Sequence, residues 1–423
     1  MGILRERPLR ILAADDSAVM RGIMRKLFEM HAGDQRSELP AMELCGVAQD
    51  GVECMEAVKR LSPDVLVLDL EMPRLNGLDV LDRLRVERPG LPVIMCSSYT
   101  EHGARSTLEA LARGASDYVM KPTEQRDFAA ALLSLSGQLL PRIAVLARGV
   151  NRREDAAGAA GAAARAKDVE AQGQAAAGQA TAAQANGAQA KGGLATVEVV
   201  VIGLSTGGPS ALEQLLPRLA VDFPVPVLIV QHMPKLFTGA LAERLDKCCA
   251  LRVKEAYEGA ALTPGTIWLA PGGEHMEVAP RKTMAGESDA AAGRGGRVRL
   301  HQREPLNHCK PSVDYLFYSA ARMYGAGALA LVMTGMGADG LDGARAVHAR
   351  GGVVLAQDEA TSAVWGMPGR IADAGIASAT LPLASIAGAL RQRVNAGRAA
   401  RPGLAQHAAT AVASRREGMH DLL

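Results

Sequence analysis

Short apolar runs rich in β-branched residues alternate with helix-like segments along most of the chain. Because helical segments, rather than two-residue turns, connect these runs, neighbouring strands have to lie parallel, with the helices as crossovers. Parallel strands are buried on both faces, which agrees with runs that show no polar alternation. The pattern therefore predicts an α/β fold. Its main runs are residues 9–14, 44–48, 65–68, 93–96, 118–120, 199–202, 226–230, 266–270, 328–333 and 352–356.

The composition changes between about residues 148 and 196, where Ala, Gly and Gln replace the branched apolar residues and no aromatic residue occurs. A segment without an apolar stripe has nothing to dock against a core, so we expect a flexible linker. At ~45 residues its span would be on the order of 35–40 Å. The chain thus divides into two doubly wound parallel-sheet domains. Their expected bounds are residues 8–125 and 197–392, with a helix and linker over 126–196 and a mobile tail over 393–423.

The composition also argues against several classes of protein. A net charge of +2 and only 3% aromatic residues provide neither the basic field nor the stacking surface that nucleic-acid binding uses. No apolar run approaches the ~20 residues of a membrane span, and residues 1–10 lack a signal-peptide core. The six cysteines have no zinc-type spacing. We therefore expect a cytoplasmic protein with reduced thiols, no nucleic-acid partner and no membrane insertion.

Acidic residues end two strands of the first domain. Asp15 and Asp16 follow the first run and Asp69 ends the third, while Ser97 and Lys121 end two others. In a parallel sheet these strand ends meet at one edge. Single acidic residues at such places are often helix caps, but a convergent set suits a hard cation such as Mg²⁺ and a carboxylate that accepts a phosphoryl group.

These residues resemble the motifs of the response-regulator receiver family over roughly residues 8–125. The matching stretches are Asp15-Asp16-Ser17, Asp69-Leu70-Glu71-Met72-Pro73, Asn76-Gly77, Ser97-Ser98 and Tyr118-Val119-Met120-Lys121-Pro122. The resemblance implies that Asp69 is phosphorylated and that Asp15, Asp16, Asp69 and the Glu71 carbonyl bind Mg²⁺. It also implies that Ser97 and Lys121 contact the phosphoryl group and that Tyr118 changes rotamer. The polar residues 31–41, which we expect to form a loop, exceed the compact family pattern.

A second set of chemically active residues ends strands of the second domain. Ser205 follows Gly203-Leu204 and precedes Thr206-Gly207, which fits the G-x-S-x-G nucleophile pattern at a strand-to-helix turn. His232 and Asp339 follow two further strands, so the three side chains can meet at one edge. A histidine that accepts the serine proton and a carboxylate that orients the histidine complete a nucleophilic triad. The chain order Ser, His, Asp differs from that of α/β-hydrolases.

Each of these residues also has a structural interpretation. Ser205 could lie in an ordinary glycine-rich turn, His232 could begin a helix, and Asp339 could cap the helix that follows Gly340. His301, His308 and Cys309 lack metal-ligand spacing, so we expect solvated loop residues there. We expect His275 and Met276 to be structural residues near the active edge, and residues 281–297 to form a polar surface loop.

The second domain resembles the catalytic domain of the CheB family of chemotaxis protein-glutamate methylesterases over roughly residues 197–392. The matching stretches are residues 203–208, Gln231-His232-Met233-Pro234, residues 270–276, Lys310-Pro311-Ser312-Val313-Asp314, residues 334–340 and Gly366-Met367-Pro368. The resemblance implies that Ser205 is the nucleophile, His232 the base and Asp339 its partner, with Thr206 and Met336 lining the site. It implies methylesterase and glutaminase activity on chemoreceptors without a cofactor in this domain, and a CheA-type histidine kinase as phosphodonor.

The order of the two domains leads to an expectation about regulation. We expect the unphosphorylated first domain to cover the Ser205 edge and to leave it on phosphorylation, a population shift of a few kcal/mol at most. Two other classes remain open. One is a phosphorylation-controlled binding protein whose catalytic half is inactive. The other is a transcriptional response regulator, although the second half shows no short helix-turn-helix segment or basic recognition helix.

Overall fold

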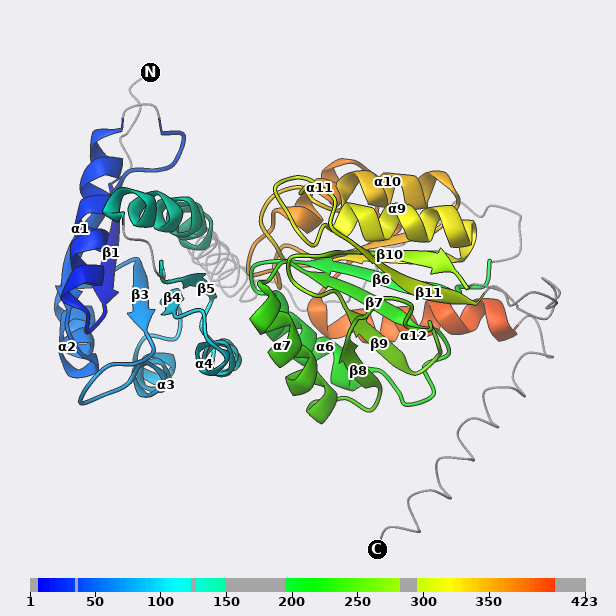
Figure 1. The fold of residues 1–423 in the computed structure, drawn as a ribbon, viewed down its shortest axis with the longest axis horizontal. Helices are drawn as coiled ribbons and strands as arrows, with labels where there is room; N and C mark the ends of the chain where they lie inside the picture. Colours follow the sequence, from blue (N-terminus) through cyan, green and yellow to red (C-terminus); the bar gives the residue numbers. More distant parts are fainter. Residues whose placement is uncertain (1–6, 35–36, 123–126, 149–194, 282–294, 400–423) are drawn as a thin grey trace, which may run out of the picture.

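A computed structural model describes residues 7–34, 37–122, 127–148, 195–281 and 295–399, which form two α/β domains (Figure 1). The first domain has a parallel sheet in the order β2-β1-β3-β4-β5, as a doubly wound fold requires. Its strands are β1 (Leu9–Ala14), β2 (Met42–Ala48), β3 (Val65–Asp69), β4 (Val93–Ser97) and β5 (Asp117–Met120). Its helices are α1 (Ala18–Gly33), α2 (Gly51–Leu61), α3 (Gly77–Glu87), α4 (Glu101–Ala112) and Phe128–Arg148.

Helices cover both faces of this first sheet. Ile11 and Ala13 of β1 pack with α1 and the helix Phe128–Arg148, whereas Leu12 and Ala14 pack with α2, α3 and α4. Helix Phe128–Arg148 is long and apolar enough to cross a membrane by length and composition. Its residues Leu135, Leu139 and Ile143 are fully buried against the sheet, however, so it serves as a core helix.

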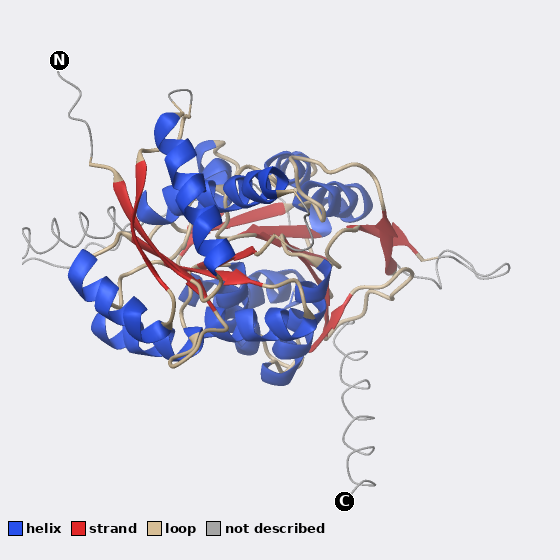
Figure 2. Cartoon of the chain, turned by 60° about the vertical axis from the view of Figure 1, so that its left-hand side comes forward, coloured by secondary structure: helices blue, strands red, loops and turns tan. Residues whose placement is uncertain are grey.

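The second domain has a seven-stranded parallel sheet in the order β14-β13-β12-β6-β7-β9-β8. Helices α6, α7 and α12 cover one face, and α9, α10 and α11 cover the other (Figure 1). Figure 2 shows helices packed on both sides of strands. Its strands are β6 (Val199–Leu204), β7 (Val227–Gln231), β8 (Arg252–Glu255), β9 (Thr266–Leu269), β12 (Ala328–Val332), β13 (Val353–Gln357) and β14 (Ala379–Leu381). Its helices are α6 (Gly208–Leu215), α7 (Lys235–Cys248), α9 (Val313–Tyr324), α10 (Leu341–Ala349), α11 (Met367–Asp373) and α12 (Leu383–Ala399).

Strands β10 (His275–Pro280) and β11 (Gly296–His301) form an antiparallel hairpin outside the main sheet. The hairpin lies against α9, where the Ser319 hydroxyl accepts a hydrogen bond of 2.9 Å from the Val278 N–H. The predicted fold class, two doubly wound parallel sheets, is confirmed, and the hairpin is an addition to it.

Several sequence-based boundaries differ from the structure. Helix α1 continues to Gly33, because His31 is buried and its ring lies 2.9 Å from the Pro40 carbonyl, so the expected loop starts later. Strand β6 continues to Leu204 rather than stopping at Gly203, and β11 takes up the end of the expected loop 281–297. Helix α12 runs to Ala399, so the start of the expected tail is helical. The expected linker, from residue 149 to 194, and residues 400–423 lie outside the described residues.

The two domains touch through α4 and β5 of the first and α6 and α7 of the second (Figure 1). Tyr118 of β5 stacks on Phe237 of α7, with ring centroids 4.8 Å apart and planes at 9°. The Ser210 hydroxyl of α6 donates to the Leu111 carbonyl of α4 over 3.0 Å. A single hydrophobic cluster therefore runs from one domain into the other.

Candidate active and phosphorylation sites

Ser205 lies in the turn between β6 and α6, where close backbone packing demands glycine. Gly207 has a left-handed φ of 76°, and a Cβ there would come within 2.5 Å of Ala363. The loop after β12 passes on the other side, where a Cβ on Gly335 would come within 2.8 Å of the Ser205 Cβ. The Ser205 N–H donates to the Thr334 carbonyl over 3.0 Å. These contacts fix the serine backbone at the carboxyl edge of the sheet. Ser205 is half-exposed there.

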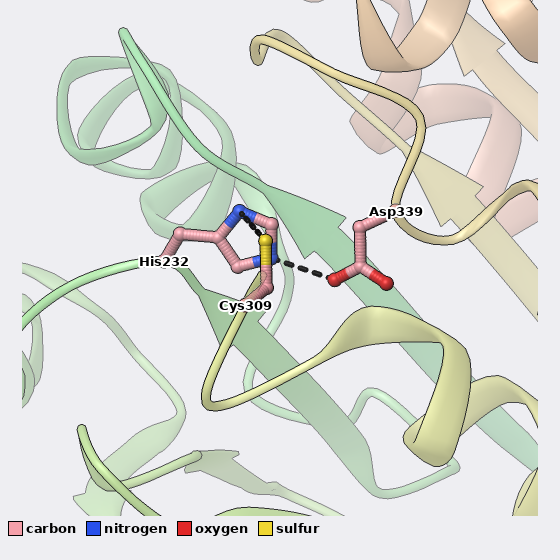
Figure 3. Close-up of side chains that lie close together, drawn as sticks. All are labelled: His232, Cys309 and Asp339. Atoms are coloured by element: carbon pink, nitrogen blue, oxygen red, sulfur yellow. Dashed lines mark hydrogen bonds and ion pairs between the residues drawn. The ribbon is translucent and has the colours of Figure 1, made fainter. Parts of the chain in front are cut away.

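His232 and Asp339 form a hydrogen-bonded pair at the same edge. His232 follows β7, which pairs with β6 so that Leu204 lies opposite Gln231. His232 Nε2 lies 2.8 Å from Asp339 Oδ2, and Figure 3 shows the carboxylate directed at this side of the ring. Because the carboxylate accepts the Nε2 proton, Nδ1 is the nitrogen left to accept a proton from another group.

Buried donors surround the Asp339 carboxylate. Oδ2 accepts the Val313 N–H over 2.7 Å, and Oδ1 accepts the Ser312 hydroxyl over 2.7 Å and the Gly340 N–H over 3.1 Å. Val313 begins α9, so the carboxylate sits at the positive end of that helix. Asp339 is thus a cap as well as a partner of His232, but its helix is α9 rather than the α10 expected from the sequence.

These contacts shift both pKa values in a way that favours an ion pair. Burial raises the pKa of Asp339, but the bonds from His232, Val313 and Ser312 outweigh it and hold that pKa below its usual range. Burial lowers the pKa of His232, but the Asp339 carboxylate and Cys309 outweigh it and raise that pKa to about 9. In this structure the His232 imidazole is therefore protonated at neutral pH, because its pKa of about 9 lies above 7.

The Ser205 hydroxyl makes no hydrogen bond to His232 within the described part of the chain. His232 Nδ1 lies instead 3.7 Å from the Cys309 thiol, whose sulfur lies in front of the ring (Figure 3) and within 4.8 Å of an Asp339 oxygen. The prediction of a solvated Cys309 is therefore wrong, because this half-buried thiol contacts the imidazole. His301 is also not solvated, since it packs at 5.1 Å from the ring of His275, which is fully buried. His308 is exposed, as expected.

Thr206 and Met336 lie beside Ser205 and touch the first domain. The Thr206 hydroxyl donates to Asp117 Oδ2 of β5 over 2.8 Å, and Asp117 is also paired with Arg142 at 3.0 Å. Met336 follows β12 and packs against the apolar cluster that contains the helix Phe128–Arg148. Within the described residues, the backbone N–H groups of Thr206 and Met336 donate no hydrogen bond. The Thr206 and Met336 N–H groups are therefore free donors near the serine, in residues that contact the first domain.

The acidic edge of the first domain brings together the residues expected there. Lys121 Nζ lies 3.0 Å from Asp15 Oδ2 and 2.7 Å from Asp69 Oδ2. Oxygens of Asp15, Asp16 and Asp69 all lie within 4.8 Å of one another. Burial and the neighbouring Asp15 raise the pKa of Asp69 to about 6, against the opposing effect of Lys121.

The surroundings of this edge fit a hard cation and a phosphoryl group. A cavity of about 120 Å³ is lined by Asp16, Asp69, Ser97 and Lys121, among others. Three carboxylates around a small polar cavity are the donor set that Mg²⁺ prefers. The Ser97 hydroxyl accepts from Thr107 over 2.7 Å, so it is held at the cavity wall.

Sequence reasoning missed several residues that shape the two sites. Ser312 holds Asp339, and Asn307 links Asp339 to Asp314, donating to the two carboxylates over 3.4 Å and 2.8 Å. Asp117 reaches Thr206 from the other domain. The family-like stretch 310–314 could have indicated Ser312, but no local sequence signal marks a contact such as Asp117–Thr206, which depends on how the domains dock.

Two family models match the chain. The response regulator receiver domain matches residues 11–133, and the CheB methylesterase matches residues 200–390. Among solved structures, the CheB methylesterase catalytic domain of Thermotoga maritima is 38% identical, covering 47% of this chain and 99% of its own, with a TM-score of 0.43. The response regulator domain of the same organism's CheB is 37% identical, covering 32% and 94%, with a TM-score of 0.27.

Full-length relatives match most of the chain. A protein-glutamate methylesterase/protein-glutamine glutaminase of Trichodesmium erythraeum is 37% identical over 385 residues, or 91% of this chain and 99% of the relative. A protein with the same name from a Nocardioides species is 40% identical over 387 residues, or 91% and 95%. The similarity thus extends across both domains and their order.

Proposed function

This chain belongs to the CheB family of protein-glutamate methylesterases/protein-glutamine glutaminases, and on that premise we propose how its residues carry out and regulate the reaction. The enzyme removes methyl esters from glutamate side chains and deamidates glutamines, which serves adaptation in chemosensory signalling. The observation that carries the residue assignment is the buried His232–Asp339 pair one strand away from Ser205. As substrates we propose methyl-accepting chemoreceptors.

Ser205 is the nucleophile in this proposal. Its oxygen forms a bond to the ester carbonyl carbon while its proton passes to Nδ1 of His232, the ring nitrogen that Asp339 leaves free. Asp339 holds the ring and stabilises the imidazolium that forms. The C–O bond to the methoxy group then breaks, and His232 returns the proton so that methanol leaves.

Water completes the cycle by hydrolysing the acyl-enzyme. His232 accepts a proton from the water, whose oxygen bonds to the acyl carbon, and then returns the proton to Ser205. The product is a glutamate carboxylate. With a glutamine side chain, the same steps release ammonia instead of methanol, which gives the glutaminase activity.

The free N–H groups of Thr206 and Met336 suit the negative charge that develops on the carbonyl oxygen. Thr206 opens the turn that leads into α6, and Met336 lies in the loop after β12. Donors fixed by the backbone need no reorganisation when the charge appears, and losing one costs ~10²–10³-fold in rate. We assign no cofactor to this half of the reaction.

The substrate would approach through a cavity of about 420 Å³ where the two domains meet. It is lined by Tyr99, Pro234, Lys235, Glu274, Gln302 and Lys310. Pro234 lies two residues after His232, and Lys310 adjoins Cys309, so the cavity is lined by chain neighbours of the site rather than by Ser205 or His232. Its polar, mixed-charge lining suits a surface segment of a receptor better than an apolar ligand.

Asp69 is the proposed phosphorylation site of the first domain. A carboxylate oxygen of Asp69 bonds to phosphorus as the bond to the donor breaks, and a CheA-type histidine kinase is the proposed donor. Lys121 and Ser97 bind the phosphoryl oxygens. Asp15, Asp16 and Asp69 would hold Mg²⁺, which when bound offsets the negative charge of the phosphoryl group.

The first domain restrains the second in the unphosphorylated state. Support comes from the Asp117–Thr206 bond beside the nucleophile and from Tyr118, which stacks on Phe237 and lies three residues before Lys121. Lys121 contacts Asp69 and directly follows β5, which carries the interface residues Asp117 and Tyr118. A phosphoryl group on Asp69 would therefore shift Lys121 and with it the end of β5. Departure of β5 frees Thr206 and lets the Ser205 hydroxyl turn to His232 Nδ1.

All six cysteines are free, which agrees with a reducing compartment, and we propose that the enzyme works in the cytoplasm.

Methanol release from methylated receptor membranes tests the assignment of the nucleophile. We expect Ser205→Ala to lower the rate by ~10⁴-fold or more, because removal of the serine removes the whole acyl route. Ser385→Ala, which changes an exposed serine in the first turn of α12, is the matched control and should leave the rate unchanged. Release that persists in Ser205→Ala would overturn the assignment. No release from the unsubstituted enzyme, even with phosphodonor, would favour a binding protein with an inactive catalytic half.

A further inference from the structure

The loop between β11 and α9, residues 302–312, carries residues that contact the Asp339 carboxylate. Ser312 donates its hydroxyl to Asp339 Oδ1 over 2.7 Å, and Asn307 donates its amide to the same oxygen over 3.4 Å. Two consecutive non-glycine residues of this loop, Asn307 and His308, have left-handed φ values of 53° and 61°. Such a conformation costs free energy and persists only where the surrounding structure holds it. The loop therefore needs anchors outside itself.

His275 of β10 ties two points of this loop to the hairpin. Its Nδ1 accepts the Ser312 N–H over 3.1 Å, and its Nε2 lies 3.2 Å from the Glu304 carbonyl. Because Nδ1 must be unprotonated to accept an N–H, Nε2 carries the ring proton and donates it to the carbonyl. Burial and the neighbouring His301 lower the pKa of His275, which favours this neutral form. Both ring nitrogens are thus used to hold loop backbone.

The ring of His275 is itself held by its surroundings. It is fully buried and packs against His301 and Tyr315, whose ring centroids lie 5.1 Å and 4.5 Å away. His301 ends β11 and Tyr315 lies in the first turn of α9, so the two elements that the loop connects both contact the ring. A side chain that packing locks in this way keeps its hydrogen-bond partners in a defined geometry.

Ser312 passes this geometry on to Asp339. It is the N-cap residue of α9, a position where a serine hydroxyl ordinarily accepts a helix N–H. Here the Asp339 carboxylate accepts the N–H groups of Val313 and Asp314 over 2.7 Å and 3.3 Å, and the Ser312 hydroxyl donates to Asp339. The position of the Ser312 backbone therefore decides whether its hydroxyl reaches Asp339, and the N–H of that backbone is bound to His275.

We propose that His275 is a positioning residue of the esterase site, which holds Ser312 so that its hydroxyl fixes the Asp339 carboxylate against His232. It acts through these groups on the orientation of the imidazole, and so on the proton transfer from Ser205 rather than on substrate binding. The effect on catalysis rests on the proposed function, whereas the anchoring of the loop does not.

Two substitutions of His275 separate its two hydrogen bonds. In His275→Asn the side-chain oxygen can take the place of Nδ1 and accept the Ser312 N–H, but the shorter side chain does not reach the Glu304 carbonyl. In His275→Gln the terminal amide takes the place of Nε2 and can donate to Glu304, but no acceptor replaces Nδ1. Both variants lose the ring and its contacts with His301 and Tyr315, so each is the matched control for the other.

Hydrogen exchange of the full-length protein tests the anchoring without an activity assay. Mass spectrometry of peptides that cover residues 302–312 should show ~10-fold faster exchange in His275→Gln than in His275→Asn, because only His275→Gln loses the acceptor of the Ser312 N–H. Peptides of the first domain serve as the reference and should exchange equally in the two variants. Equal exchange of the loop in both variants would overturn the anchoring.

Methanol release tests the effect on catalysis. We expect His275→Gln to lower kcat by ~10–100-fold, the value of a hydrogen bond to a carboxylate, with KM changed ~2-fold or less. His275→Asn should lower kcat by no more than ~3-fold. Ser312→Ala should lower kcat by a factor similar to that of His275→Gln, and adding it to His275→Gln should cause no further loss, since both act on the same contact with Asp339.

Equal kcat in the two His275 variants, or losses that multiply in the double variant, would overturn the positioning role and leave His275 as a structural residue of the hairpin. Faster loop exchange in His275→Gln, together with no methanol release from the unsubstituted enzyme under any condition, would support the anchoring while refuting the proposed function.

Discussion

The two domains place their chemistry at the same position, the carboxyl edge of a parallel sheet, but hold it in different states. In the first domain, Lys121 already bridges Asp15 and Asp69 beside a small cavity. In the second, the His232–Asp339 pair is formed, but Nδ1 lies 3.7 Å from the Cys309 thiol and Thr206, next to Ser205, is bound to Asp117. The residues of the acidic edge already contact one another, whereas at the serine edge the residue next to Ser205 is bound to the other domain.

The difference separates what strand order determines from what the docking of the two domains determines. Strand order brings the residues of each edge together, because β1, β3, β4 and β5 end side by side, as do β12, β6 and β7. In our proposal, engagement of Ser205 with His232 depends on what covers that edge. That edge is contacted by β5 of the other domain, and Lys121, which follows β5, contacts Asp69, the proposed phosphorylation site.

The largest expected effect concerns the His232–Asp339 pair, which is already formed at the serine edge. Asp339→Asn should lower the rate of methanol release by ~10³–10⁴-fold, because the amide cannot stabilise the imidazolium or hold the required tautomer. Asp342→Asn is the matched control, since Asp342 lies at the start of α10 in a surface pair with Arg345. A loss of less than tenfold in Asp339→Asn would mean that His232 works without this partner.

A second prediction concerns the protonation state of His232. Its pKa is raised to about 9, and only the unprotonated ring can accept the serine proton. Activity of the unphosphorylated enzyme should therefore rise ~10-fold per pH unit below the pKa and level off near pH 9. The pH dependence of kcat/KM, corrected with Ser205→Ala for uncatalysed ester hydrolysis, checks this. A midpoint of the kcat/KM profile below pH 7 would contradict an ion pair between His232 and Asp339.

The raised pKa also predicts a pH dependence of stability. The folded-state pKa of about 9 lies above the ordinary histidine value, so the His232–Asp339 pair contributes its full stability below that ordinary value. The contribution should be lost as the pH rises through about 9, and denaturant unfolding between pH 6 and 10 measures it, with His232→Gln as the reference. An unchanged difference in stability between the two proteins across this range would argue against the shift.

The smallest effect should come from the contact between the two edges. Asp117→Ala removes the acceptor of the Thr206 hydroxyl and should raise activity without phosphodonor by ~5–10-fold, which corresponds to about 1 kcal/mol for a lost hydrogen bond. Arg142→Ala is the control, because it breaks the Asp117–Arg142 pair but leaves the Thr206 bond in place. Equal activity in both variants and the parent would show that this bond does not hold the domains together.

Much of this arrangement is predictable from the sequence, for physical reasons that particular residues illustrate. Unbroken apolar runs identify the central strands, so the fold class and the clustering of Asp15, Asp69 and Lys121 follow from parallel topology. Short edge elements such as β14, and helices α11 and α12, escape detection because they carry weak periodic patterns. Cys309 escapes because its proximity to His232 arises from a loop 77 residues away in the chain.

The accessibility of Ser205 tests most directly the claim that one edge controls the other. A fluorophosphonate probe labels an activated serine, and the rate of labelling of the full chain can be measured with Mg²⁺, with and without acetyl phosphate. The account predicts faster labelling with the phosphodonor, no such increase in Asp69→Asn, and no labelling in Ser205→Ala. A labelling rate that the phosphodonor leaves unchanged in the unsubstituted protein would contradict it.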